Sequence, residues 1–271
     1  MSSASQLRFE LADRAERYAR AHSLPHCFSY GQGCVVCFEP FGNGLHGNFY
    51  PSSYGAIQAN PEWRRRLKKV HTTARTTLPR SDYGSRSELD SCMSSDALLM
   101  NVFCLPRVMR LREVAGTLGL GTEAAVRFGY RARVPMSENR CDQTEVDMRI
   151  GEMLVEAKLT ENDFQRAPKE KLLRYRDFWD VFDAAALPQD GSHYHGYQLI
   201  RNVLAAYDRR CAFCVLLDSR RGDLMEAWYA VMRCVIPVEL RTSCKVLTWQ
   251  ELSRVLPRGL QQFLARKYGI E

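Results

Sequence analysis

Apolar and polar residues alternate along residues 144–161, TEVDMRIGEMLVEAKLTE, in the pattern of two half-buried β-strands. Gly151 and Glu152 stand at the centre of this stretch. Glycine at the first central position suits a two-residue type II′ turn, because that position requires a positive φ angle. The pattern therefore predicts a β-hairpin whose strands are joined by Gly151 and Glu152.

This turn also fixes which residues of the two strands face each other. The expected facing pairs are Ile150 with Met153, Asp147 with Glu156, and Glu145 with Lys158. One face is then entirely apolar and consists of Val146, Met148, Ile150, Met153, Val155, Ala157 and Leu159. The other face consists of Glu145, Asp147, Arg149, Leu154, Glu156 and Lys158. We expect the apolar face to pack into the core.

The same periodicities predict the other elements of the chain. Helices are expected over residues 4–22, 61–70, 87–103, 169–185, 197–209, 224–233, 250–256 and 260–268, and strands over residues 127–134, 211–218 and 245–249. Residues 23–54 are rich in turn-forming residues and are expected to be irregular. The order of elements predicts an α/β fold with a mixed central sheet flanked by helices. We expect a core over residues 86–271 and an N-terminal extension over residues 1–85.

Composition narrows the class of protein only moderately. The chain has 271 residues, 45% hydrophobic and 25% charged, which excludes a disordered protein. Its formal charge of +7 favours an anionic partner such as nucleic acid. The start of the chain carries charges throughout and lacks an apolar signal segment, and no stretch is long and apolar enough for a membrane span. We expect a cytoplasmic protein without membrane contact, whose ten cysteines are free thiols, core residues or metal ligands.

The charged face of the hairpin has two possible explanations. Directly opposed residues have Cβ atoms about 4.5–5.5 Å apart, so Asp147 and Glu156 would repel each other unless a cation lay between them. A Mg²⁺ ion commonly binds one or two carboxylates, and Lys158 would then lie within reach of a substrate phosphate. Alternatively, the face is solvated, and Lys158 and Arg149 pair with the neighbouring carboxylates.

The spacing of these residues resembles a known nuclease signature. Asp147, followed after eight residues by Glu156-Ala157-Lys158, resembles the PD-(D/E)xK motif, although Val146 stands in place of its proline. The resemblance implies a restriction-endonuclease-like fold and hydrolysis of DNA with Mg²⁺ or Mn²⁺. It also implies that Asp147 and Glu156 bind the metal and that Lys158 is the catalytic lysine.

The resemblance covers about residues 86–250 and suggests two further site residues. Members of the superfamily often place another acid on the first core helix, where Glu88 is the matching candidate for a catalytic and metal-binding residue. A carboxylate that stabilises the start of that helix is the alternative. RecB-like members carry a Gln and, four residues later, a Tyr. Gln198 matches the Gln and would contact nucleic acid, but Asn202 stands in place of the Tyr, and a simple polar helix face is the alternative.

Two other groups of residues suggest binding. Cys27, Cys34, Cys37 and His46 have a spacing that could close a structural Zn²⁺ site, whereas CVVCF, residues 34–38, also matches a buried strand. The basic side chains of the helix expected after Asn60 could contact the phosphates of nucleic acid or be merely solvated; they are Arg64, Arg65, Lys68 and Lys69.

The leading hypothesis is a Mg²⁺-dependent nuclease acting on DNA. The alternative is a nucleic-acid-binding protein that keeps a nuclease-like fold without catalysis, with an N-terminal region that zinc supports. The sequence leaves open DNA against RNA, endonuclease against exonuclease action, and the oligomeric state.

Overall fold

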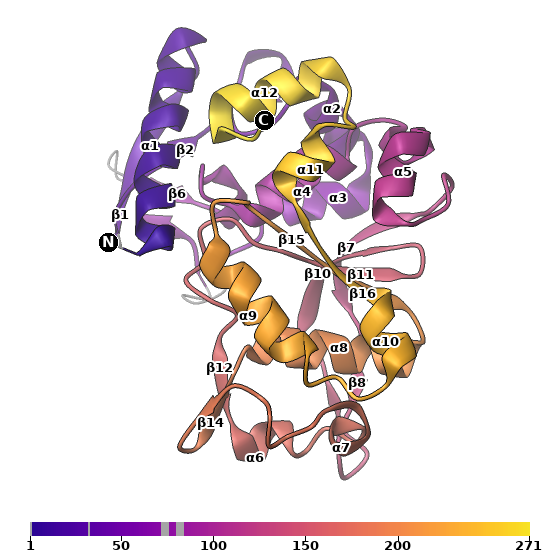
Figure 1. Cartoon of the computed structure of the whole chain (residues 1–271). Coiled ribbons are helices and arrows are strands. Elements are labelled where there is room, and N and C mark those ends of the chain that lie inside the picture. Colours follow the sequence, from indigo (N-terminus) through magenta and orange to yellow (C-terminus); the bar gives the residue numbers. More distant parts are fainter. Residues whose placement is uncertain (1, 32, 72–75, 80–83) are drawn as a thin grey trace. The chain divides into compact units, whose positions relative to one another are not determined.

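The computed structural model describes residues 2–31, 33–71, 76–79 and 84–271 (Figure 1). Its contacts divide the chain into two compact units. The first unit comprises Met1–Glu123 and Trp249–Glu271, and the second comprises Ala124–Thr248. These boundaries differ from the predicted division after residue 85, because residues 86–123 and the C-terminal helices pack with the N-terminal residues.

Residues 124–248, which the structure describes without a gap, contain a five-stranded mixed sheet (Figure 1). Its strands, in spatial order, are β16 (Cys244–Thr248), β15 (Ala212–Leu217), β11 (Met153–Ala157), β10 (Glu145–Ile150) and β7 (Val126–Arg131). Strand β10 runs antiparallel to its two neighbours β7 and β11, whereas β11, β15 and β16 run parallel to one another. The predicted mixed α/β sheet is therefore confirmed.

The longer helices of this second unit, α8 (Tyr197–Arg209), α9 (Gly222–Met232) and α10 (Val238–Ser243), contribute to its core. Leu154, Phe213 and Val215 of the sheet belong to the same core as Val203 of α8 and Trp228 of α9. Every residue of β11 is buried. Burial on both sides of a strand is typical of parallel sheets whose faces are covered, so any charge on β11 is withdrawn from water.

The remaining elements of the second unit are short. They are β8 (Val134–Pro135), β9 (Cys141–Asp142), β12 (Arg166–Pro168), β13 (Gln189–Asp190), β14 (His193–His195), α6 (Lys169–Leu172) and α7 (Phe178–Val181). The single helix predicted over residues 169–185 is wrong. The backbone of residues 174–176 instead bonds to residues 135–137, which takes hydrogen bonds away from a continuous helix.

The hairpin that joins β10 and β11 has the predicted register. Met148 pairs with Val155, Arg149 with Leu154, and Ile150 with Met153. Gly151 has a φ angle of +52°, as a turn of the predicted kind requires. The sequence of the turn therefore sets the alignment of the two strands that carry the charged residues.

The first unit is built around its terminal helices. The predicted N-terminal helix is α1 (Ser3–Ala21), which packs against α12 (Arg258–Tyr268) and buries Leu7, Leu11 and Ala15. Its other helices are α2 (Pro51–Ala59), α3 (Pro61–Arg66), α4 (Ser95–Phe103), α5 (Arg112–Leu118) and α11 (Trp249–Ser253), with 3₁₀ turns at Gly42–Gly44, Glu88–Asp90 and Val108–Arg110. Its strands are β1 (His26–Gly31), β2 (Gly33–Phe38), β3 (Pro40–Phe41), β4 (Leu45–His46), β5 (Leu78–Pro79) and β6 (Ser85–Arg86).

Three sequence predictions for this unit are wrong in part. Residues 26–31 and 33–38 form two paired antiparallel strands rather than irregular structure, because Val36 and Phe38 become fully buried. Helix α3 ends at Arg66, and Val70 remains 42% exposed instead of packing. The helix expected from residue 87 begins only at Ser95, because serine side chains cap a 3₁₀ turn and then the helix start.

No helix in the described ranges is long and apolar enough to cross a lipid bilayer.

Replacing Gly151 by Ala should lower the free energy of unfolding by about 1–2 kcal/mol, because an L-residue is strained at a positive φ angle. The new Cβ atom would also lie 3.1 Å from the Cβ atom of Ala124. Gly116→Ala is the control, because Gly116 lies in α5 with no atom within 4 Å of the added carbon. This change should raise the free energy of unfolding by about 0.5–1 kcal/mol. Denaturant unfolding measures both, and an unchanged Gly151→Ala stability would contradict the turn.

Candidate active site

Glu156 and Lys158 form a buried ion pair on the strand β11 and directly after it. Their exposed fractions are 2% and 4%. The Nζ atom of Lys158 donates a hydrogen bond of 2.8 Å to Oε1 of Glu156. Lys158 therefore pairs with a neighbouring carboxylate, as the alternative to a metal site predicted. That alternative is wrong in expecting a solvated pair, because β11 lies inside the sheet with parallel β15 beside it.

The helix α8 supplies the second contact of Glu156. Asn202 is fully buried, and its Nδ2 atom donates a hydrogen bond of 2.8 Å to Oε2 of Glu156. The guanidinium of Arg201 in turn donates to Oδ1 of Asn202 at 3.0 and 2.9 Å, and to the carbonyl of Glu145 at 3.1 Å. Both oxygens of the Glu156 carboxylate therefore accept hydrogen bonds, and the amide of Asn202 has a fixed orientation.

Asp147 reaches the same place from the neighbouring strand. Its Oδ2 atom accepts a hydrogen bond of 2.8 Å from the backbone N–H of Ala157. Ala157 stands between Glu156 and Lys158, so the structure brings together the three residues of the predicted motif. Glu145, which was expected to face Lys158, instead lies 3.7 Å from the guanidinium of Arg131.

The charges around Lys158 keep both members of the pair ionised. Burial by itself lowers the pKa of Lys158, but the negative charges of Glu156, Glu161 and Asp147 raise this pKa above its ordinary value. Burial by itself raises the pKa of Glu156, but the positive charges of Lys158 and Arg201 bring it below its ordinary value. At neutral pH the site therefore contains an ammonium group among carboxylates.

Gln198 lies on α8, four residues before Asn202, and its side-chain oxygen is buried. Its Oε1 atom has no hydrogen-bond partner among the described residues. Its backbone N–H donates to the carbonyl of Phe164 at 3.0 Å, and the Phe164 ring lies 5.6 Å from the Nζ atom of Lys158. Gln198 therefore joins the same neighbourhood as the ion pair.

Glu88 lies in the first unit, where it takes part in an ion-pair cluster. The Nζ atom of Lys69 donates to Oε1 of Glu88 at 2.9 Å and also to the carboxylate of Asp96. Arg66 donates to Oδ2 of Asp96 at 2.9 Å. Burial raises the pKa of Glu88, and the positive charge of Lys69 opposes this effect. Glu88 thus begins the 3₁₀ turn Glu88–Asp90 and pairs with Lys69, and its role as a metal-binding residue stays a prediction.

The predicted basic residues divide into two groups. Arg64, Arg65 and Lys68 are exposed on and beside α3, which is capped by the side chain of Asn60 as predicted. Lys69 is instead engaged with carboxylates. The exposed cations are therefore the ones that remain available for phosphate groups.

The four residues of the predicted zinc site lie in different settings. Cys27 faces Cys37 across the hairpin of β1 and β2, whereas Cys34 is exposed near the other end of that hairpin. His46 lies 3.2 Å from the carboxylate of Asp90, and its other ring nitrogen accepts from the N–H of Asn48. In the part of the chain that the structure describes, no group of three or more His, Cys, Asp or Glu side chains is arranged to hold a metal ion.

Three further residues of the site, Asn202, Arg201 and Glu161, do not stand out as site residues in the sequence. Arg201 is a cation among the buried, mostly apolar residues of α8, such as Ile200 and Leu204. A cation in such a position indicates that a polar partner lies opposite it. Glu161 follows three residues after Lys158, and its carboxylate accepts from the N–H of Leu159 at 2.7 Å. Their positions beside Glu156 and Lys158 become apparent only in the folded structure.

A family model described as Restriction Endonuclease associating with ARP matches residues 14–269. The match spans nearly the whole chain, including the hairpin and α8, and it supports a restriction-endonuclease-like nuclease with nucleic acid as its partner. No curated protein and no solved structure matches this chain.

Replacing Glu156 by Gln, or Lys158 by Met, should lower the free energy of unfolding by about 3–5 kcal/mol, because each change leaves the other charge buried without its partner. The double replacement should recover much of this loss. Denaturant unfolding of the four proteins gives the coupling energy, and additive single effects would contradict the buried pair.

This coupling should be constant between about pH 5 and pH 10. The pKa of Glu156 is lowered, so its contribution is complete above the ordinary carboxyl pKa and is lost only as the pH falls through the lowered value. The pKa of Lys158 is raised, so its contribution is complete below the ordinary lysine pKa and is lost only as the pH rises through the raised value.

Proposed function

We propose that this chain, which belongs to the family described as Restriction Endonuclease associating with ARP, is a Mg²⁺- or Mn²⁺-dependent nuclease of the PD-(D/E)xK type that hydrolyses phosphodiester bonds of DNA. One observation carries the proposal. Glu156 and Lys158 are buried together at the carboxyl end of the central strand β11, with the Asp147 carboxylate hydrogen-bonded to the peptide between them.

The burial of these charges supports a chemical role rather than a stabilising one. Removing two charges from water costs several kcal/mol per ion, and a hydrophobic pair of similar volume is often as stable or more stable. Charged groups with shifted pKa values cluster at functional sites. Glu156 and Lys158 have both features, in the interior of a sheet where apolar residues would pack well.

The donor atoms suit a hard divalent cation. Asp147 and Glu156 supply carboxylate oxygens, and Mg²⁺ is usually held by one or two carboxylates together with water and substrate phosphates. Such a metal, when bound, activates water and neutralises the charge that develops on the phosphate. Asp147 is only partly buried, so its carboxylate is accessible from outside the core.

Lys158 acts as a positive charge and a hydrogen-bond donor in this proposal. Because carboxylates raise the pKa of Lys158, the amine keeps its proton at neutral pH and does not serve as a general base. An ammonium group beside the scissile phosphate would stabilise the negative charge of the transition state. Glu156 orients this ammonium group through their 2.8 Å contact.

The helix α8 holds these groups in position. Asn202 fixes the second oxygen of Glu156, and Arg201 fixes Asn202. Residues of this kind, which orient metal ligands without touching the metal, are typically worth 10–100-fold in metal affinity or activity. Gln198 presents an acceptor oxygen to the same neighbourhood and is suited to receive a hydrogen bond from substrate or water.

Purified protein should cleave DNA in the presence of Mg²⁺ or Mn²⁺ and lose cleavage in EDTA. Asp147→Ala and Lys158→Met should each reduce the cleavage rate by about a thousandfold or more, because each removes a group that contacts metal or phosphate. Glu152→Gln, an exposed carboxylate in the turn of the same hairpin, is the matched control and should retain the full rate.

A gel assay on linear and closed-circular duplex measures the rate and separates end-dependent from internal cleavage. Circular dichroism and unfolding curves show whether each variant folds. Cleavage that persists in folded Asp147→Ala would contradict the catalytic assignment. Salt-sensitive DNA binding without metal-dependent cleavage would instead support the non-catalytic function.

Replacing Arg64, Arg65 and Lys68 together by Gln should weaken DNA binding uniformly across sequences. The slope of log K against log salt concentration should become shallower by about 0.9 for each phosphate contact that is lost. Fluorescence anisotropy at several salt concentrations measures this slope. The control replaces Arg17 and Arg20, which pair with Asp13 and Glu16 within α1. An unchanged slope in the triple variant would contradict a role of α3 in binding.

A further inference from the structure

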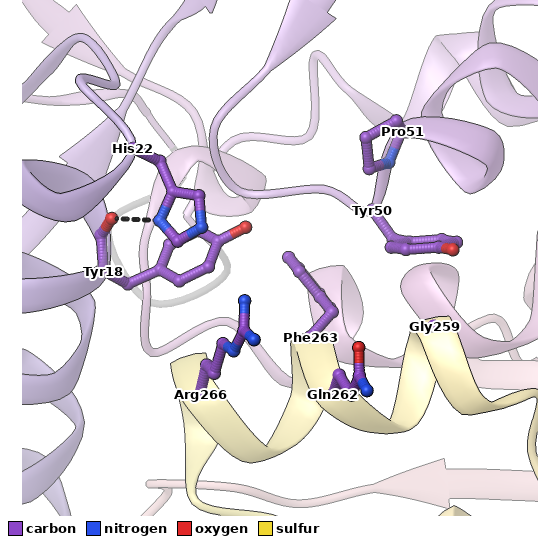
Figure 2. A pocket seen from close by; sticks show the side chains of 8 residues that line it. All are labelled: Tyr18, His22, Tyr50, Pro51, Gly259, Gln262, Phe263 and Arg266. Atoms are coloured by element: carbon purple, nitrogen blue, oxygen red, sulfur yellow. Dashed lines mark hydrogen bonds between the residues drawn. The ribbon is translucent and has the colours of Figure 1, made fainter.

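The first unit contains a hollow of about 160 Å³ at the junction of α1, α2 and α12 (Figure 2). Three aromatic side chains line it: Tyr18 of α1, Tyr50 directly before α2, and Phe263 of α12. The centre of the Phe263 ring lies 5.8 Å from that of Tyr18 and 5.7 Å from that of Tyr50. A cavity of about 150 Å³ is sufficient for benzene, so this hollow has the size for a single aromatic ring.

The rim of the hollow is polar and positively charged. Arg266 and Gln262 of α12 line it. Figure 2 shows the Arg266 side chain extending toward His22 and Tyr18. Arg266 supplies the positive charge, and none of the described residues that line the hollow is Asp or Glu. This rim suits an anionic group.

Local geometry holds the aromatic walls in place. The Nδ1 atom of His22 lies 2.9 Å from the backbone carbonyl of Tyr18, so the imidazole ring of His22 is held at the end of α1. A Cβ atom at Gly259 would lie 2.6 Å from the hydroxyl oxygen of Tyr50. Glycine at this position therefore allows the Tyr50 ring to lie close to α12, and the hollow keeps its shape.

We propose that this hollow binds a pyrimidine nucleotide, with the base against the aromatic rings of Phe263 and Tyr50 and the phosphate beside Arg266. Stacking on aromatic side chains is available to every base, and a guanidinium group pairs well with phosphate. A one-ring base matches the size of the hollow. The nucleotide could be free or an unpaired residue of a strand, because both present the same base and phosphate. The proposal does not depend on nuclease activity.

Isothermal titration calorimetry of the full chain in EDTA tests the proposal with cytidine monophosphate as the probe. The nucleotide should bind more tightly than either cytidine or inorganic phosphate, because it engages both the rings and Arg266. Arg266→Gln and Tyr50→Leu should each weaken binding about tenfold or more. Arg258→Gln, an exposed arginine of the same helix that does not line the hollow, is the control and should bind normally.

Competition by short oligonucleotides identifies the source of the nucleotide. If an unpaired oligonucleotide displaces cytidine monophosphate and a fully paired duplex does not, the hollow takes a base from a strand. If neither displaces it, the hollow takes the free nucleotide. Asp147→Ala should bind the nucleotide as the unaltered chain does, which separates this test from that of catalysis. The proposal would be overturned if the unaltered chain did not bind cytidine monophosphate. It would also be overturned if folded Arg266→Gln and Tyr50→Leu bound it as tightly as the unaltered chain does.

Discussion

The buried contact between Glu156 and Lys158 is the constraint on which the rest of the site depends. A charge pair inside a sheet is tolerated only if each polar atom has a partner, and here the carboxylate is held by Lys158 on one side and Asn202 on the other. The helix α8 must therefore pack with Asn202 facing β11, and Arg201 must turn back to hold that amide. The helix α8, which lies in the connection between the parallel strands β11 and β15, thus supplies both apolar packing and the residues that hold Glu156.

The site combines a buried ion pair with a carboxylate, Asp147, that is partly exposed. The pair is rigid because it is buried, whereas Asp147 is partly exposed and reaches it through one bond to the Ala157 peptide. In the nuclease that we propose, a substrate or cation arriving from solvent would meet Asp147 before the buried ammonium group of Lys158. The excess of basic residues and the exposed cations of α3 would attract a polyanion without selecting the bond that is cleaved.

The hairpin was predictable in detail because its information is local. A glycine at the turn and a strict alternation fix the register, and the three observed pairs follow it. Burial of Glu156 and its contact with Asn202 were not predictable, because they depend on a helix more than forty residues later in the chain. The predicted helix over residues 87–103 was wrong in its first part, since competition from serine side chains is decided by small energy differences. The zinc hypothesis rested on spacing alone, which does not reveal that Cys27 and Cys37 face each other across a hairpin while Cys34 lies elsewhere.

The proposed nuclease site requires that Asp147 and Glu156 share a divalent cation beside the ammonium group of Lys158. Anomalous scattering from crystals grown with Mn²⁺ tests it directly, because the method locates the ion independently of the protein atoms. We expect one peak within about 2.0–2.4 Å of oxygens from both carboxylates, with Asn202 still hydrogen-bonded to Glu156. A peak bound by other residues, or none at saturating Mn²⁺ with the contact between Glu156 and Lys158 unchanged, would contradict it.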